Sequence, residues 1–318
     1  MGDNMKTRDK TMTTLKSFPI LIALAALSAC STMNSGHSAA PAAGQQTFAT
    51  PEEAVRAVGA MAGGGDEKRT EEIFGPGSND LVRSGDEVAD HDRALEVKAM
   101  IDRKVAFEDL DTNMKVALLG DDAWPFPIPL VKGRSGWYFD TEAGREEVEN
   151  RRVGRNELET LATLHAVVDA QREYGASHGG AYAQRVISSK GKHDGLYWPV
   201  AAGKPSSPLG PLVAEAAAEG YKAGNEPQPY HGYYFKMLTA QGANAPEGAK
   251  SYLDAKGAMT KGFAMVAWPA NYGNSGKMTF LVSDRGIVFQ KDLGENTESV
   301  ASAITTYDPD DSWDPTGD

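Results

Sequence analysis

Residues 141–174, TEAGREEVENRRVGRNELETLATLHAVVDAQREY, form the longest helical pattern in this chain of 318 residues. Side chains such as Leu158, Leu161 and His165 recur three or four positions apart, which places them on one face of a helix. Gly175 follows directly and is a typical helix terminator. The stretch therefore predicts one long helix whose less polar face must be covered by another element.

The segment after this helix contains strand-like runs. Four of them have a suitable length and composition, and they span residues 233–239, 262–268, 277–282 and 286–291. The polar residues 274–276 and 283–286 supply tight turns before and after the third run. We expect a four-stranded antiparallel sheet packed on the long helix, in an α+β domain over residues 141–318.

The segment before the helix predicts a smaller α+β domain over residues 50–140, with helices first and a small curled sheet after them. Thr50 can cap a helix, Pro51 fits its first turn, and Glu53 completes a capping box. Further helices are expected over residues 67–74 and 86–107, and strands over residues 115–119, 126–132 and 137–139. Prolines alternate through the middle strand, which predicts that it lies at a sheet margin.

The N-terminus has the features of an export signal. Residues 1–29 begin with basic side chains and continue into an apolar stretch that is shorter than the roughly 20 residues that span a bilayer. The tetrapeptide Leu27-Ser28-Ala29-Cys30 resembles the bacterial lipobox. That resemblance implies that the peptide is cut before Cys30 and that the Cys30 thiol carries a diacylglycerol. An ordinary buried cysteine beside a cleavable signal is the alternative, and the start is either Met1 or Met12.

The lipobox resemblance also implies a location. Ser31 follows the cysteine where an aspartate would retain a lipoprotein in the inner membrane, so we expect an outer-membrane protein that faces the periplasm. Several acyl chains, palmitate among them, give stable anchoring. Residues 30–49 are rich in Ser, Ala, Gly and Pro, which predicts a flexible tether between the lipid and the first domain.

Charge and cysteine content exclude some classes of function. The chain has 44 acidic and 32 basic side chains and a net charge of −12, which argues against nucleic acid as a partner. Its one cysteine rules out an internal disulfide framework and a zinc site with several cysteine ligands. Its expected partners are the membrane, through the N-terminal lipid, and other envelope proteins.

Four segments carry a family resemblance across nearly all of the chain after the signal. They are Trp124-Pro125-Phe126-Pro127-Ile128-Pro129, Arg152-Val153-Gly154-Arg155-Asn156-Glu157, Asp194-Gly195-Leu196-Tyr197-Trp198-Pro199 and Pro229-Tyr230-His231-Gly232-Tyr233-Tyr234-Phe235. On them the chain is similar to bacterial envelope lipoproteins with domain of unknown function 2950. The resemblance implies a fold and a location in the cell envelope, and it implies no activity.

The second half also resembles the head domains of type IV pilin-like proteins. The matching segments are residues 151–157, 230–235, 267–270 and 286–289, which correspond to strands and a helix of such heads. Pilins carry a long hydrophobic N-terminal helix, and this chain has a lipobox in that place. The resemblance therefore implies a sheet-on-helix head and does not imply a pilin.

No complete catalytic motif is present. Residues 175–179 fit G-x-S-x-G, but a helix precedes the serine where a nucleophile elbow needs a strand, so we assign no catalytic residue. Four side chains on loops are candidates for a shared binding cleft: His193, Asp194, Tyr230 and His231. The acidic tail, residues 308–314, lacks the glycine of a calcium loop, so a solvated terminus is expected and calcium is the alternative. We predict no metal site and no cofactor.

These features favour a lipid-anchored periplasmic lipoprotein that is a non-enzymatic binding or assembly module. One alternative is an envelope hydrolase acting on cell-wall material, with His193, Asp194 and His231 in its cleft. The other is an accessory to pilus or secretion machinery that uses the pilin-like half.

Overall fold

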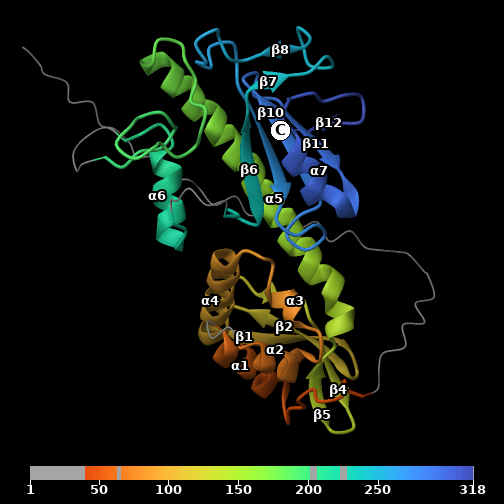
Figure 1. Cartoon of the computed structure of the whole chain (residues 1–318). Helices are drawn as coiled ribbons and strands as arrows, with labels where there is room; N and C mark the ends of the chain where they lie inside the picture. The colour runs from red at the N-terminus through yellow and green to blue at the C-terminus, as the bar shows by residue number, and fades with distance from the viewer. Residues whose placement is uncertain (1–39, 63–65, 201–205, 223–227, 318) are drawn as a thin grey trace, which may run out of the picture. The chain divides into compact units, whose positions relative to one another are not determined.

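The computed structural model describes residues 40–62, 66–200, 206–222 and 228–317 (Figure 1). Contacts group residues 39–318 into one compact unit. Two large hydrophobic cores lie within it, one built from the chain before residue 140 and one from the chain after it. Together the elements form an α+β fold that combines antiparallel sheets with a long helix, as the sequence predicts. No helix among the described residues is both long and apolar enough to cross a membrane.

Four helices open the fold, and most of them start at residues that cap well. They are α1 (Pro51–Met61), α2 (Glu67–Phe74), α3 (Asn79–Val82) and α4 (Glu87–Arg103). Thr50 caps α1 by accepting a hydrogen bond from the Glu53 amide, and Asp86 caps α4 in the same way through the Ala89 amide. The expected helices over residues 50–61 and 67–74 are therefore confirmed.

The helix expected over residues 86–107 ends early. It stops at Arg103, and β1 (Val105–Asp111) follows at once. No glycine or proline lies between the helix and the strand. Instead, residues 105–111 become a strand because they pair with β2 (Met114–Leu119), from Val105 opposite Leu119 to Asp111 opposite Met114. A hydrogen-bonded partner strand here overrides the local helical pattern.

The first sheet has the order β1-β2-β4-β5, and β3 also pairs with β2. Its remaining strands are β3 (Trp124–Pro125), β4 (Leu130–Gly133) and β5 (Gly136–Phe139). The single strand expected over residues 126–132 at a sheet margin is wrong. The prolines interrupt it, and the part that remains, β4, pairs with a strand on each side because it contains no proline.

The folded chain begins before Thr50. Phe48 is only 6% exposed and pairs with Trp137, with each main-chain amide donating to the other carbonyl at 2.8 Å. The Gln45 side-chain amide donates to the carbonyls of Ile73 and Phe139. Within the described part of the expected tether, residues 40–49, the segment 45–49 is thus attached to the edge of the first core through Gln45 and Phe48.

The long helix is present as α5 (Thr141–Ser177), capped by Asp140, and it passes through Gly154 without interruption. In its early turns Val148 packs against the first core, and in its later turns Leu164 is part of the second core. The expected apolar face is partly wrong. Leu158 is 68% exposed, whereas the polar Asn156 is buried. The helix thus buries polar groups in its middle, where it passes between the two cores.

The second sheet has the order β12-β11-β10-β9-β6. Its strands are β6 (Tyr233–Leu238), β9 (Ala264–Pro269), β10 (Met278–Ser283), β11 (Val288–Asp292) and β12 (Asp314–Pro315). The four expected strands are confirmed as an antiparallel sheet. The acidic tail is mostly exposed to solvent, as expected, and its end also pairs with β11 as a fifth strand, β12.

Short elements complete the second half. They are α6 (Gly210–Glu219), β7 (Ala240–Gln241), β8 (Lys250–Ser251), η1 (Gly294–Asn296) and α7 (Thr297–Ala303). In Figure 1, α5 and α7 lie against the second sheet, and they contact β10 and β9 respectively. All six residues of β9 are buried, so both faces of the sheet are covered at its centre.

Candidate functional site

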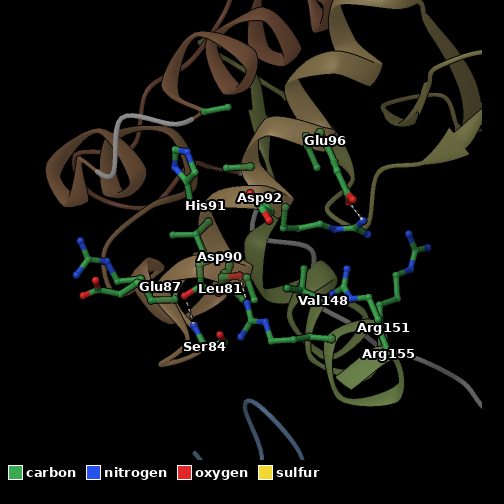
Figure 2. A pocket seen from close by; sticks show the side chains of 18 of the residues that line it. Leu81, Ser84, Glu87, Asp90, His91, Asp92, Glu96, Val148, Arg151 and Arg155 are labelled. Carbon is green, nitrogen blue, oxygen red and sulfur yellow. Dashed lines mark hydrogen bonds and ion pairs between the residues drawn. The ribbon is translucent and has the colours of Figure 1, made fainter. Parts of the chain in front are cut away.

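A cavity of about 830 Å³ opens beside α4 and the first half of α5, and Tyr221 and His231 also line it. We call it the α4–α5 pocket. Figure 2 shows Asp92 and Glu96 on one side of it and Arg151 and Arg155 on another. Its size lies within the roughly 300–1,000 Å³ that is typical of sites for small molecules.

One wall of the α4–α5 pocket is apolar and continuous with the first core. It is formed by side chains from α1, α2, α4, α5 and the β3–β4 connection: Val58, Phe74, Val97, Phe126, Ile128 and Val148. The rings of Phe74 and Phe126 stack with centroids 6.4 Å apart. Such a wall favours a ligand with an apolar body.

Two arginines gather around Trp124, whose ring packs edge-on against Phe126 of the apolar wall. Arg93 from α4 and Arg151 from α5 each place a guanidinium over the Trp124 ring, 5.2 and 5.1 Å from its centre. Arg93 is also paired with Glu96 at 2.7 Å, and Arg151 with Glu147 at 2.6 Å. These two arginines are therefore held in place by the Trp124 ring and balanced in charge by their glutamates.

Arg152 has a structural role. Its guanidinium is buried and donates to the Leu81 carbonyl, the Asp80 carbonyl and the Asn274 side-chain oxygen. Burial lowers its pKa, and the charges of Asp90 and other carboxylates oppose that change. Arg152 thus joins α3, α5 and the turn before β10 and has few donors left for a ligand.

Arg155, one turn further along α5, differs from these neighbours. It lines the pocket half-buried and makes no hydrogen bond or ion pair with any other described residue. Burial lowers its pKa to about 10, and the like charges of Arg93 and Arg152 contribute to the change. The charges of Glu96 and Glu159 oppose this change, but neither carboxylate lies within ion-pair distance of Arg155. The Arg155 guanidinium therefore lines the cavity with N–H donors that no described residue accepts from.

The far side of the pocket carries a carboxylate beside a histidine. His231 Nε2 lies 3.2 Å from Glu219 Oε2, yet that oxygen is buried and accepts no hydrogen bond from the described residues. Burial raises the pKa of Glu219, and the charge of His231 opposes this effect. Glu219 is thus a carboxylate whose charge is incompletely compensated.

A polar network fixes this side in place. Asp86, the cap of α4, accepts hydrogen bonds from the Tyr221 hydroxyl at 2.8 Å and from the Gly232 amide at 2.9 Å. The His231 amide donates to the same hydroxyl at 3.2 Å, and His231 has a positive φ of 48°. Burial raises the pKa of Tyr221. A non-glycine residue in this conformation is strained, and strain of this kind is held by its surroundings and clusters at functional sites.

The four residues expected in a shared cleft fall into two pairs with different neighbours. Tyr230 and His231 contact each other and the Tyr221 ring, and His231 lines the α4–α5 pocket. His193 stacks on Trp198, with ring centres 4.3 Å apart, and Asp194 accepts hydrogen bonds from the Ser189 amide and hydroxyl.

These hydrogen bonds lower the pKa of Asp194. The residues in contact with the two pairs do not overlap. A single cleft that contains all four residues remains a prediction.

The G-x-S-x-G segment lies at the end of α5. The Ser177 hydroxyl donates to main-chain carbonyls of the preceding turn and lies 2.9 Å from His178 Nδ1, whose ring stacks on Tyr174. Among the described residues, no group of three or more His, Cys, Asp or Glu side chains is arranged to hold a metal ion. Cys30 lies outside the described residues.

Arg155 and Glu219 were not among the candidate residues from the sequence. The arginines at positions 151, 152 and 155 do carry a signal, because this spacing places them on neighbouring turns of one helix face. Glu219 carries no such signal, since it ends a short alanine-rich helix and meets the pocket only through tertiary packing.

Three of the four segments that carry the family resemblance meet at this pocket. Trp124 and Phe126 come from the first, Arg155 from the second and His231 from the fourth. Residues 45–316 match the model of a family described as "Protein of unknown function (DUF2950)". No curated protein and no solved structure matches the chain.

Proposed function

Because the chain belongs to the DUF2950 family of proteins of unknown function, we propose its role from its own pocket and its own N-terminus. The protein is a non-enzymatic envelope lipoprotein, anchored through lipid on Cys30 and facing the periplasm. Its α4–α5 pocket binds a small ligand that carries an anionic group and an apolar body.

The unpaired guanidinium of Arg155 carries this proposal. A half-buried cation that lacks a hydrogen-bonded partner destabilises the folded chain, because burial removes much of its hydration and the nearby charges of Glu96 and Glu159 offset only part of that loss. An anion bound in the pocket would restore the missing charge-assisted hydrogen bonds, which contribute about 1.5–3 kcal/mol each. The apolar wall beside it supplies the rest of the contact area for such a ligand.

Calorimetric titration with hexanoate tests the pocket, since this probe has one carboxylate and one apolar chain. Hexanoate should bind the wild-type chain, and Arg155→Gln should weaken binding about tenfold, as expected when one charge-assisted contact is lost. Arg134→Gln is the matched control, because Arg134 is exposed and does not line the pocket. Equal binding by the wild type and Arg155→Gln would refute the proposal.

A hydrolase is the second candidate, and the contact of His231 with Glu219 on the pocket wall favours it. A histidine oriented by a carboxylate can act as a general base. The test is the release of soluble fragments from purified cell-wall sacculi by the wild type and by His231→Gln. If the wild type releases none, this candidate is removed.

A further inference from the structure

Two incompletely compensated side chains of opposite charge line the α4–α5 pocket. Arg155 forms no hydrogen bond or ion pair with another described residue. Glu219 Oε2 is buried and accepts no hydrogen bond from the described residues, and its one charged neighbour within ion-pair distance among them is His231 Nε2 at 3.2 Å. Each is costly in isolation, because a buried charged group needs both a counter-charge and hydrogen bonds. They come from different elements, Arg155 from α5 and Glu219 from the end of α6.

The surroundings of Glu219 are negative. Besides the opposing charge of His231, three carboxylates act on it: Glu215 on its own helix, Asp92 on α4 and Glu159 on α5. A cation placed here gains from all of them, whereas an anion is repelled. A single carboxylate with free lone pairs suits an ammonium group, while hard metal ions take about six or more oxygen ligands.

The positive and negative regions open into one cavity. Glu159 connects them, because its charge acts on Arg155 as well as on Glu219. All three side chains line the same cavity, together with the apolar Val97 and Val148. The pocket therefore offers a cationic group, an anionic region and an apolar wall to one molecule.

We propose that the ligand is a zwitterion, and specifically a short peptide with apolar side chains and both termini free. Its carboxylate binds Arg155, its ammonium binds Glu219, and its side chains lie against the apolar wall. This inference rests on the proposed function, in which Arg155 binds the anionic group. It adds a second recognised charge and thereby names the class of ligand.

The test uses the dipeptide leucyl-phenylalanine in three forms: free, N-acetylated and C-amidated. Each form is titrated calorimetrically into the full-length chain and into the variants Glu219→Gln and Arg155→Gln. For the wild type, the free form should bind tightest, and removal of either terminal charge should weaken binding about tenfold or more. Glu219→Gln should bind the free and N-acetylated forms within about twofold of each other, and Arg155→Gln should do the same for the free and C-amidated forms.

Glu215→Gln is the matched control. Glu215 is exposed on the same helix and does not line the pocket, so this variant makes the same charge change away from the ligand. Because Glu215 acts on this region only through its charge, the variant should keep most of the preference for the free amine. If Glu215→Gln lost that preference, the ammonium would be attracted by the summed charge of the surrounding carboxylates and not by contact with Glu219. That result would overturn the assignment of the ammonium to Glu219.

The remaining outcomes separate this inference from the proposed function. If the N-acetylated form binds as well as the free form and still needs Arg155, the zwitterion is wrong and the anion site stands. If the C-amidated form binds as well as the free form and Arg155→Gln has no effect, both are wrong. If hexanoate binds but no form of the dipeptide does, the peptide assignment alone is overturned.

Discussion

Arg152 of α5 donates a hydrogen bond to the main-chain carbonyl of Leu81, 71 residues earlier in the chain. The same guanidinium reaches the side-chain oxygen of Asn274, so one side chain joins α3, α5 and the turn before β10. These segments belong to both halves of the sequence. Arg152 therefore stabilises the region where the two cores meet and holds α5 beside the pocket.

Arg152→Met should lower the free energy of unfolding by about 3 kcal/mol, because it keeps the length of the side chain but leaves buried carbonyl acceptors without a donor. Urea unfolding measures the change. Arg172→Met is the control on the same helix, where the exposed arginine contributes little, and it should change stability by at most about 0.5 kcal/mol. Equal losses in the two variants would contradict a special role for Arg152.

Gly232, beside His231, should tolerate no side chain. It has a φ of +76°, and a Cβ there would lie 2.6 Å from Asn156 Nδ2 and 3.0 Å from Ser275 Cβ. Gly248 has nearly the same φ, +75°, but no atom within 4 Å of such a Cβ. Backbone strain alone should cost both alanine variants about 1 kcal/mol.

Gly232→Ala should cost a further 1–3 kcal/mol, roughly, because Asn156 and Ser275 must move. The comparison of the two variants by urea unfolding isolates this steric effect from the shared backbone strain. A loss in Gly232→Ala no larger than that in Gly248→Ala would mean that the Asn156 side chain moves away freely.

The long helix and the second sheet could be predicted because their signals are local. Asp140 caps α5, and the turns around residues 274–276 and 283–286 lie where the sequence places them. The strand β1 could not be predicted, because its sequence, VAFEDLD, becomes a strand only by pairing with β2. Local pattern decides an element only where no partner strand competes.

The site was harder to predict than the fold. Tyr230 and His231 were recognised as candidates because an aromatic and a titratable side chain stand together on an expected loop. His231 does line the pocket. Arg155 and Glu219 were missed because what distinguishes them is that they are partly buried and lack hydrogen bonds to the described residues, which depends on what the folded chain places around them. Leu158 illustrates the same point, since its spacing favours burial and yet its side chain is 68% exposed.

The lipid anchor predicts a clear biochemical result. Cys30→Ser should abolish incorporation of labelled palmitate and release the protein from membranes, because no second attachment is proposed. Metabolic labelling followed by membrane fractionation measures both. Ser31→Asp is the companion variant, and by the retention rule it should keep the label and move the protein to the inner membrane. Palmitate labelling that persists in Cys30→Ser would contradict the anchor.

Glu219 predicts a pH-dependent change in stability. Burial raises its pKa above the ordinary value of 4.5, so the folded chain disfavours the charged carboxylate more than the unfolded chain does. This penalty is present above the folded-state pKa and vanishes below the unfolded-state value, where the carboxyl is protonated in both states. Glu219→Gln should therefore have a higher Tm than the wild type at pH 7.5 and the same Tm at pH 4.

Thermal unfolding of both proteins across this pH range provides the test. Glu215→Gln is the exposed comparison, and it should raise the Tm at pH 7.5 much less than Glu219→Gln, because Glu215 contributes only a repelling charge. The groups that act on Glu219 from other elements are His231, Asp92 and Glu159. A lower Tm for Glu219→Gln at pH 7.5 would mean that the attraction of His231 outweighs burial. In that case Glu219 already has its counter-charge, and the case for a bound ammonium would be lost with it.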